Sequence, residues 1–395
     1  MYVVPRFLLS CFFAFVAGHV MNYSVIFYAQ EVLGSDLLAG VGFFLSFGGA
    51  PLLVGWYAGA LCDRQSPSML ILLSQILFVV AALLMLLLQY LEWGPLSRVA
   101  IFLLASTVAG VAWCFIAPAR LALLGRLVPL DRLHGVSVLF NVLVMVGFGL
   151  APILIALLRG SFGWPGPLGA VLLLFILASL LLSGIRVTVP ELPSASVWSD
   201  VRGGLRYILG NPLMLQLLLL TLIVYSVMGP VQVMIPRFAL DVLELTPMQR
   251  GGLLAVMAVA LFAGGLVCML FGKRLHQGKA VIGSLLLSSL LMLAFSFSDV
   301  LWQASVWLLL AGIFAGVSVS LIVAALQLNA EDRYRGRVMS MYTISTQVLP
   351  ATSGLLCGVV LEFISPASGL SLAAAILLLL GGLAWWRMGV LRRYA

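Results

Sequence analysis

The sequence predicts an all-α membrane protein with 12 transmembrane helices, arranged as two pseudo-symmetric six-helix bundles. Three observations predict this class: the composition, the spacing of apolar runs and a repeat of loop motifs. Of the 395 residues, 63% are hydrophobic and only 9% are charged, whereas soluble domains are about a quarter charged. The runs also lack the polar faces that helices of a large soluble protein need, which disfavours that class.

Twelve apolar runs are long enough to serve as spans. A helix needs roughly 20 apolar residues to cross a bilayer, and helices are required because lipid offers no partners to backbone groups. The first run is too long for the core of a signal peptide, so we interpret it as the first span. The predicted spans are 7–30, 37–61, 69–91, 99–119, 136–158, 168–185, 213–235, 252–271, 281–297, 302–326, 338–361 and 370–386.

The basic residues predict the orientation. Twelve spans put both termini on one side, and all but four of the 21 Lys and Arg residues fall in loops on that side, Arg120 among them; the exceptions are Arg98, Arg159, Arg237 and Arg250. Basic loops stay in the cytoplasm, so both termini are predicted to be cytoplasmic. The net charge of +8 is therefore a topology signal, and we expect no nucleic-acid partner.

A polar interval divides the spans into two sets of six. It holds Pro190, Pro193 and several serines, which is typical of a linker. The predicted domains are an N-terminal six-helix bundle (1–188), a cytoplasmic linker (189–211) and a C-terminal six-helix bundle (212–395). A short helix on the membrane surface is expected in the linker, because four apolar residues recur there at helical spacing: Trp198, Val201, Leu205 and Ile208.

The two halves repeat a loop motif. Asp131-Arg132-Leu133-His134-Gly135 follows span four, and Asp332-Arg333-Tyr334-Arg335-Gly336 follows span ten. Two parallel six-span repeats are a transporter architecture, whose site is expected at the repeat interface near mid-membrane.

The loop between spans two and three carries a family resemblance. Gly59-x-Leu61-x-Asp63-Arg64 resembles the signature loop of major facilitator superfamily transporters, although Ser66, Pro67 and Ser68 stand where that signature has a glycine and two basic residues. The segments 118–129 and 335–342 resemble the drug-efflux branch that includes enterobactin-exporter-like and macrolide-efflux-like proteins.

The resemblance implies a secondary active transporter that works by rocker-switch alternating access. We expect it to export a small amphipathic compound, a siderophore or a hydrophobic drug, across the bacterial inner (cytoplasmic) membrane. Its partners would be that small-molecule substrate and the lipid bilayer, with coupling to protons as an open possibility, and it would be a monomer.

The first span carries the strongest candidate site. His19 lies 13 residues after Arg6, hence about 20 Å into the helix, and ionisable residues inside a membrane are expensive and usually functional. Asn22, Tyr23 and Gln30 share its helix face. The stripe predicts a cavity lining, with His19 as a substrate contact or a proton-linked switch. The alternative is a neutral histidine bonded to a neighbouring helix.

Other spans carry fewer polar residues that could line the cavity. By the resemblance, spans one, four, five, seven, ten and eleven line it, and the further candidates are Trp113, Asn141, Tyr225, Gln232, Tyr342, Thr346 and Gln347. Interhelical hydrogen bonding and ordinary packing are the alternatives. Glycines at 147 and 149 allow span five to approach a neighbour closely.

The acids are expected outside the spans. Glu31 and Asp36 are predicted to be solvated loop acids. No acid lies deep in a predicted span, which disfavours a proton antiporter built on a buried carboxylate. Coupling through His19, through edge carboxylates or no coupling at all remain open.

A gate is predicted at the cytoplasmic side. Asp63 would meet the start of span eleven, where the helix dipole and the arginines favour a carboxylate. The predicted gating residues are Gly59, Asp63, Arg64, Arg335 and Arg337.

The residues that an intramembrane enzyme, a metal site or an ATP-driven pump would need do not occur in the required patterns. An intramembrane enzyme, the distant alternative, needs converging nucleophiles, histidines or carboxylates, whereas His134 and His276 fall in predicted loops and His19 stands alone. The five cysteines show no metal spacing, so we expect no metal, no cofactor and no enzyme. No Gly-Lys-Ser/Thr phosphate loop is present, which excludes an ATP-driven pump within this chain. An importer or lipid flippase of the same fold remains an alternative.

Overall fold

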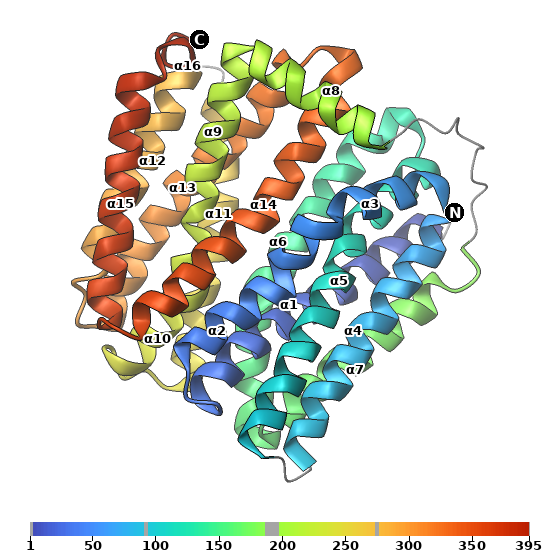
Figure 1. Cartoon of the computed structure of the whole chain (residues 1–395), viewed down its shortest axis with the longest axis vertical. Coiled ribbons are helices and arrows are strands. Elements are labelled where there is room, and N and C mark those ends of the chain that lie inside the picture. Colours follow the sequence, from blue (N-terminus) through green and yellow to red (C-terminus); the bar gives the residue numbers. More distant parts are fainter. Residues whose placement is uncertain (1–2, 91–93, 186–196, 273–275, 395) are drawn as a thin grey trace. The chain divides into compact units, whose positions relative to one another are not determined.

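A computed structural model describes residues 3–90, 94–185, 197–272 and 276–394 (Figure 1). Within helices, the side chains of a few residues lie outside this description, Asp63 and Arg64 among them. The described ranges hold 12 helical segments long and apolar enough to cross a membrane, which confirms the predicted fold class. They are Val3–Glu31, Asp36–Gly55, Pro67–Tyr90, Pro95–Leu127, Gly135–Phe162, Pro165–Leu182, Pro212–Asp241, Pro247–Phe271, Gln277–Phe295, Leu301–Asn329, Arg333–Leu361 and Pro366–Arg387.

The chain forms two compact units, Met1–Ser194 and Ala195–Ala395, called unit 1 and unit 2 below. Unit 1 contains α1 (Val3–Glu31), α2 (Asp36–Phe43), the π-helix η1 (Phe44–Gly49), α3 (Ala50–Arg64), α4 (Pro67–Tyr90), α5 (Pro95–Leu127), α6 (Leu130–Phe162) and α7 (Pro165–Leu182). Unit 2 contains α8 (Val197–Gly210), α9 (Pro212–Ser226), the π-helix η2 (Pro230–Met234), α10 (Ile235–Asp241), α11 (Pro247–Phe271), α12 (Gln277–Phe295), α13 (Leu301–Asn329), α14 (Asp332–Leu361), α15 (Pro366–Arg387) and α16 (Gly389–Arg392).

Local sequence signals set where many helices begin. Several start on a proline, whose missing N–H costs nothing in the first turn. Side chains of Ser35, Asn211, Thr246 and Ser365 cap four helices by accepting bonds from first-turn N–H groups. Thr246 forms a reciprocal capping box with Gln249. These caps fix the turns between apolar runs.

Two predicted spans contain a π-helical turn. η1 precedes Pro51 and η2 precedes Pro236. A proline removes the donor that would bond the carbonyl four residues earlier, and here that carbonyl lies within the π-helix. The wider turn absorbs the missing bond within an otherwise continuous span.

Glycines permit direct backbone contact inside each unit. A Cβ added to Gly110 would lie 1.9 Å from the carbonyl oxygen of Leu45 in η1. In unit 2, a Cβ added to Gly264 would lie 2.2 Å from the oxygen of Ile313, and one added to Gly316 would lie 2.5 Å from that of Leu261. α11 and α13 therefore meet through glycine on both surfaces.

One predicted boundary is wrong in a way that matters. The fourth span was expected to end at residue 119, but α5 continues to Leu127, and Arg120 lies inside the helix with no exposed surface. The residues after Arg120 are mostly apolar and keep the helix going, so a single charge is a poor end marker. The prediction that places Arg120 in a cytoplasmic loop is therefore wrong, because its side chain is buried within α5.

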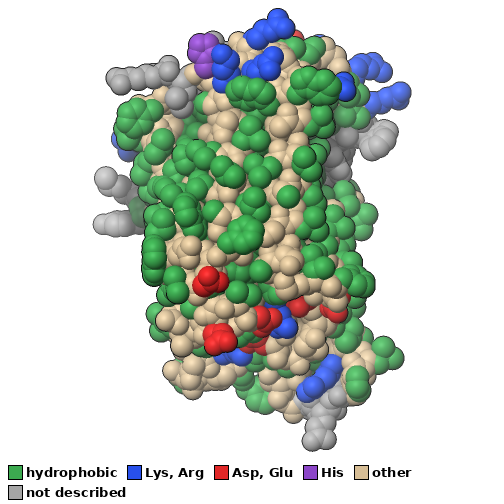
Figure 2. All heavy atoms as spheres, turned by 90° about the vertical axis from the view of Figure 1, so that its left-hand side faces the viewer, with side chains coloured by type: hydrophobic (Ala, Val, Ile, Leu, Met, Phe, Trp, Pro, Cys, Tyr) green, Lys and Arg blue, Asp and Glu red, His purple; other side chains and the backbone are tan. Residues whose placement is uncertain are grey.

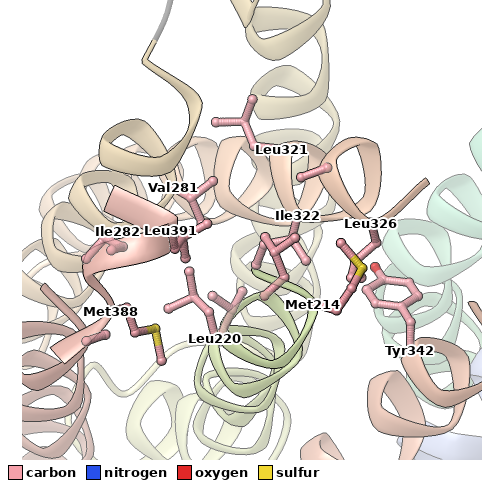
Figure 3. Packing of buried hydrophobic residues seen from close by; sticks show 14 of the residues in the cluster. Met214, Leu220, Val281, Ile282, Leu321, Ile322, Leu326, Tyr342, Met388 and Leu391 are labelled. Atoms are coloured by element: carbon pink, nitrogen blue, oxygen red, sulfur yellow. The ribbon is translucent and has the colours of Figure 1, made fainter. Parts of the chain in front are cut away.

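Unit 2 has an apolar core that also holds the end of the chain. Met214, Leu220 and Ile322 pack together in it, and Met388 and Leu391 join from the region around α16 (Figure 3). On the side of unit 2 that carries α12 and α15, hydrophobic side chains form a broad band (Figure 2). Basic side chains gather at one end of this band and acidic side chains at the other, as expected for a membrane-spanning surface.

Candidate functional site

In unit 1, one face of α1 packs against α5 and α6 to form a buried seam. Phe15, His19 and Tyr23 are spaced four residues apart, so they lie along one helix face. We call this set of side chains the α1 seam; its members are Phe15, His19 and Tyr23 of α1, Trp113 and Arg120 of α5, and Phe140 and Phe148 of α6.

Aromatic rings surround His19 and Tyr23. The His19 ring centroid lies 5.2 Å from that of Trp113 and 5.4 Å from that of Phe148. The Tyr23 and Phe148 centroids are 5.7 Å apart. Such distances are ordinary for aromatic packing, so the sequence candidates His19, Tyr23 and Trp113 meet in one apolar-walled site.

Glycines allow these helices to approach. A Cβ on Gly147 of α6 would lie 2.9 Å from the backbone carbon of Phe15, which confirms the predicted close approach of span five. Gly18 faces Trp113 and Ile116 at 3.3 Å from its added Cβ. Larger residues at these two positions would separate α1 from α5 and α6.

The polar atoms of His19 and Tyr23 are buried without hydrogen-bond partners among the described residues. His19 is 6% exposed, and neither ring nitrogen has a hydrogen-bond partner among the described residues. The Tyr23 hydroxyl is likewise buried and unpartnered there. A histidine bonded to a neighbouring helix is therefore not what the described residues show. Unmet buried polar groups cost stability and call for an explanation.

Arg120 is a seam residue that the sequence interpretation missed. Its Nη1 donates to the carbonyl oxygen of Ile116 at 2.9 Å, its Cζ lies 5.8 Å from the Phe15 ring centroid, and it contacts the Cys11 thiol. Its Nε and Nη2 have no partner among the described residues. The seven-residue spacing from Trp113 places both on one face of α5, a signal that could have identified it.

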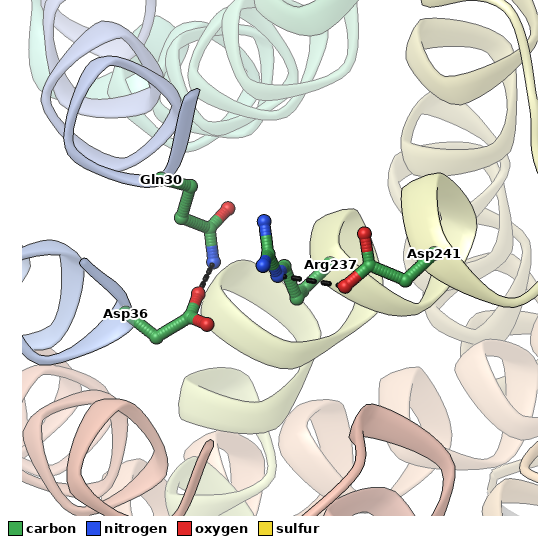
Figure 4. Close-up of polar contacts among 4 residues, drawn as sticks. All are labelled: Gln30, Asp36, Arg237 and Asp241. Atoms are coloured by element: carbon green, nitrogen blue, oxygen red, sulfur yellow. Dashed lines mark hydrogen bonds and ion pairs between the residues drawn. The ribbon is translucent and has the colours of Figure 1, made fainter. Parts of the chain in front are cut away.

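The outer part of the polar stripe is satisfied. Ser46 of η1 donates to the Asn22 Oδ1 at 3.2 Å. Gln30 Nε2 donates to Asp36 Oδ1 at 2.9 Å (Figure 4). Asn22 and Gln30 thus have hydrogen-bonding roles within unit 1, unlike His19 and Tyr23.

The two acids at the junction of α1 and α2, Glu31 and Asp36, both have polar partners in unit 1. Glu31 forms an ion pair with Arg159, whose guanidinium lies 4.7 Å from the Trp164 ring centroid. The Glu31 side chain is 12% exposed, and Asp36 accepts from Gln30. The prediction of solvated loop acids is therefore wrong, because Arg159, distant in sequence, pairs with Glu31 and the nearby Gln30 bonds to Asp36. Asn141 is exposed, one residue after the buried Phe140, and is not part of the buried seam.

In unit 2, the corresponding candidates are paired. The hydroxyls of Tyr225 on α9 and Tyr342 on α14 lie 2.6 Å apart, and their rings meet edge to face at 5.9 Å. Thr346 donates to the carbonyl oxygen of Thr343 within α14. Gln232 is buried on η2, and Gln347 is half-buried on α14. Arg237 and Asp241 form an ion pair at 2.8 Å along α10 (Figure 4).

The gating candidates of unit 2 fix the start of α14. Arg335 Nε donates to the carbonyl oxygen of Gln327 at 3.0 Å, at the end of α13. The Arg337 guanidinium lies 5.5 Å from the Tyr334 ring centroid. Tyr334 in turn stacks on Tyr207 of α8 at 4.5 Å, so the linker helix packs on this turn.

The remaining gating candidates lie in the part of α3 whose side chains are outside the description. They are Gly59, Asp63 and Arg64. The predicted latch between Asp63 and the start of span eleven stays a prediction, as do the membrane-facing roles of Trp198 and Val201. Across the described residues, no group of three or more His, Cys, Asp or Glu side chains could hold a metal ion.

Comparison with known proteins identifies the family. The model of the Major Facilitator Superfamily matches residues 6–280. The chain belongs to this superfamily. No curated protein matches it in sequence.

Solved structures share the fold of this superfamily member along its whole length. A bacterial homolog of the human lysosomal transporter Spinster, inward-facing and unoccupied, has a TM-score of 0.75 at 13% identity, with 100% of this chain and 97% of that chain covered. A bacterial homologue of the iron transporter ferroportin, inward-facing, gives 0.74 at 14% identity, covering 99% and 98%. A peptide transporter POT in complex with alafosfalin gives 0.71 at 15%, covering 99% and 95%. These likenesses show a multi-pass membrane transporter fold.

Proposed function

We propose that this protein is a secondary active transporter of a small amphipathic molecule, working by rocker-switch alternating access, and not an enzyme. The observation that carries this proposal is the α1 seam. It places a histidine, a tyrosine hydroxyl and an arginine, all buried and with unmet polar atoms, inside a spanning helix bundle of the superfamily. A bound substrate that partnered these atoms would offset their burial.

The composition of the seam indicates the chemistry of the substrate. Trp113, Phe148 and Phe140 offer apolar ring faces, which suit a flat or hydrophobic body. The Arg120 guanidinium has two unpartnered nitrogens, and a guanidinium binds a carboxylate or a similar anion through paired donors. Together they favour an amphipathic compound with an acidic group, the chemistry of a siderophore more than that of a cationic drug.

His19 is proposed as a substrate contact, with a proton-linked switch as the second role. Its ring is tilted against Trp113 and meets Phe148 edge to face, and its two unpartnered nitrogens are the atoms available to a substrate. Within unit 1, Tyr23 is proposed as a further substrate contact beside His19. Within unit 2, Tyr225 and Tyr342 are proposed as substrate contacts of their own. Proton coupling would show as a transport rate that follows the proton gradient.

Export across the bacterial inner membrane, by a monomer with both termini in the cytoplasm, is the proposed direction and setting. The Lys and Arg distribution supports the orientation, and the segments 118–129 and 335–342 support the efflux branch. The inward direction and lipid flipping use the same fold and are decided by experiment.

Vesicle flux tests the proposal. Inside-out and right-side-out vesicles carrying the protein would be incubated with a labelled catecholate siderophore, a neutral hydrophobic drug or a fluorescent phospholipid in the outer solution. Uptake of the siderophore into inside-out vesicles that is lost on His19→Ala is the expected result. Flux only in right-side-out vesicles would establish import, lipid movement alone would establish a flippase, and no flux of any probe above empty vesicles would count against the proposal.

A further inference from the structure

An apolar groove runs along the outer face of unit 2 between α12 and α15. Its volume is about 540 Å³. It is lined by Gly283, Leu286, Leu287, Leu290, Leu378, Gly382 and Trp385. From Gly283 to Leu290 it follows α12 for about 10 Å at 1.5 Å per residue.

Three glycines create this groove. A Cβ on Gly381 would lie 2.8 Å from a methyl group of Leu286, so α12 and α15 pack closely there. Gly283 and Gly382 line the groove itself, and a Cβ added at either would have no atom within 4 Å. The glycines therefore bring two helices together while leaving an open apolar groove beside their contact.

One end of the groove is basic. Trp385 lies at this end, and Arg392 stacks over its ring at 5.9 Å while donating Nη1 to its carbonyl oxygen at 3.1 Å. Arg387 lies 4.4 Å over the neighbouring Trp386 ring. Lys279 is exposed one helical turn before Gly283. Two acids lie at the opposite ends of these helices: Asp299 follows α12, and Glu362 precedes α15. Figure 2 shows acidic side chains, with a few basic ones among them, at that end of the band.

The basic end is held in place by the chain's last turns. Gly278 N–H at the start of α12 donates to the Tyr394 carbonyl oxygen at 2.9 Å. The Leu391 N–H donates to Gln216 Oε1 at 2.7 Å, and its side chain is fully buried in the unit 2 core (Figure 3). Asn329 Nδ2 donates to the Tyr394 hydroxyl at 2.7 Å. Arg392 is thus anchored between fixed neighbours beside the groove.

We propose that this groove is a binding site for an anionic phospholipid of the leaflet at its basic end. One acyl chain lies along Gly283 and Gly382, Trp385 lies at the level of the headgroup, and Lys279 and Arg392 bind its phosphate. Charge complementarity selects the anionic headgroup, because clustered basic residues beside spanning helices attract acidic lipids, and tryptophan favours the membrane interface. The lipid is a resident ligand, and this site is separate from the α1 seam and does not rest on the proposed transport.

Lipid binding to the purified full chain in neutral detergent tests the proposal. Phosphatidylglycerol and phosphatidylcholine of equal chain length would be titrated separately, with native mass spectrometry counting retained lipids and a thermal-shift assay measuring the affinity. Free glycerol phosphate is the third arm. We expect tight retention of phosphatidylglycerol only, since a headgroup without its chain cannot use the groove.

Three variants separate the two parts of the site. Lys279→Gln with Arg392→Gln is expected to weaken phosphatidylglycerol binding by roughly fivefold per removed cation. Gly382→Leu fills the groove and should abolish preferential retention without a clash, because open space surrounds it. Gly169→Leu on α7 is the matched control, since its added Cβ also meets nothing within 4 Å. Equal retention of both lipids by wild type, or unchanged phosphatidylglycerol binding in both test variants, would overturn the proposal.

Discussion

The α1 seam of unit 1 and the Tyr225–Tyr342 pair of unit 2 differ in how their buried polar atoms are partnered. In unit 2, Tyr225 and Tyr342 join hydroxyls at 2.6 Å. In unit 1, the Tyr23 hydroxyl, both His19 nitrogens and two Arg120 nitrogens are buried without partners among the described residues. Buried polar groups are normally satisfied, so the α1 seam retains a cost that the Tyr225–Tyr342 pair avoids. Groups left without internal partners are available to a ligand, and the proposed substrate site in unit 1 rests on this contrast.

The largest expected effect comes from removing the cation of the seam. Arg120→Met should lower the apparent affinity for an acidic substrate by roughly 10- to 150-fold, because a charge-assisted hydrogen bond is lost. Stability should be unchanged or higher, since replacing a buried charge by an apolar side chain of similar size is commonly neutral or stabilising. Vesicle flux and thermal unfolding measure the two quantities.

Arg120→Lys and a modified substrate are the controls for that variant. Lysine keeps the charge but not the planar fork, so an intermediate affinity is expected. A neutral derivative of the substrate, with its acidic hydroxyl groups methylated, should be transported equally by wild type and Arg120→Met. A methionine variant that transported the acid normally, or that unfolded easily, would give Arg120 a structural role only.

Replacing His19 by phenylalanine tests the cost and the role of its two unpartnered ring nitrogens. His19→Phe keeps an aromatic ring between Trp113 and Phe148 and removes two unpartnered nitrogens. We expect the free energy of unfolding to rise by about 1 kcal/mol or more, and substrate affinity to fall about tenfold. The transport rate between pH 6 and 8 separates the two roles: a pH dependence that disappears in His19→Phe would mean a proton switch, and an unchanged profile a substrate contact.

The close approach of α1 and α6 at Gly147 can be tested by adding a methyl group there. Gly147→Ala places a Cβ 2.9 Å from the Phe15 backbone, and overpacking of this kind costs about 1–3 kcal/mol. Gly160→Ala on the same helix meets nothing within 4 Å, so it should be neutral or stabilising by up to about 1 kcal/mol. Equal stability of the two variants in a denaturation assay would show that α1 and α6 do not pack as described.

The smallest effect is expected in unit 2. Tyr225→Phe should cost about 1 kcal/mol, because it leaves the Tyr342 hydroxyl buried without its partner. The double variant Tyr225→Phe, Tyr342→Phe should recover most of that loss. A double-mutant cycle of unfolding free energies gives the coupling. A single variant as stable as wild type would show that the hydrogen bond between Tyr225 and Tyr342 does not stabilise unit 2.

The sequence predicted the spans well because each is a long apolar run, and it found the His19 stripe because helical spacing places those residues on one face. It missed Arg120, because a charged residue that follows an apolar run predicts the end of a span, whereas α5 continues past it to Leu127. The Tyr225–Tyr342 pair and the Glu31–Arg159 pair join segments more than 100 residues apart. No local pattern encodes such pairs; only the packing of the helices brings them together.

The glycine contact between α11 and α13 has a mechanical consequence. With backbone against backbone at Gly264 and Gly316, no flexible side chain separates the two helices at these two positions. A displacement of one helix there moves the other helix as well. The contact therefore makes α11 and α13 a rigid pair within unit 2.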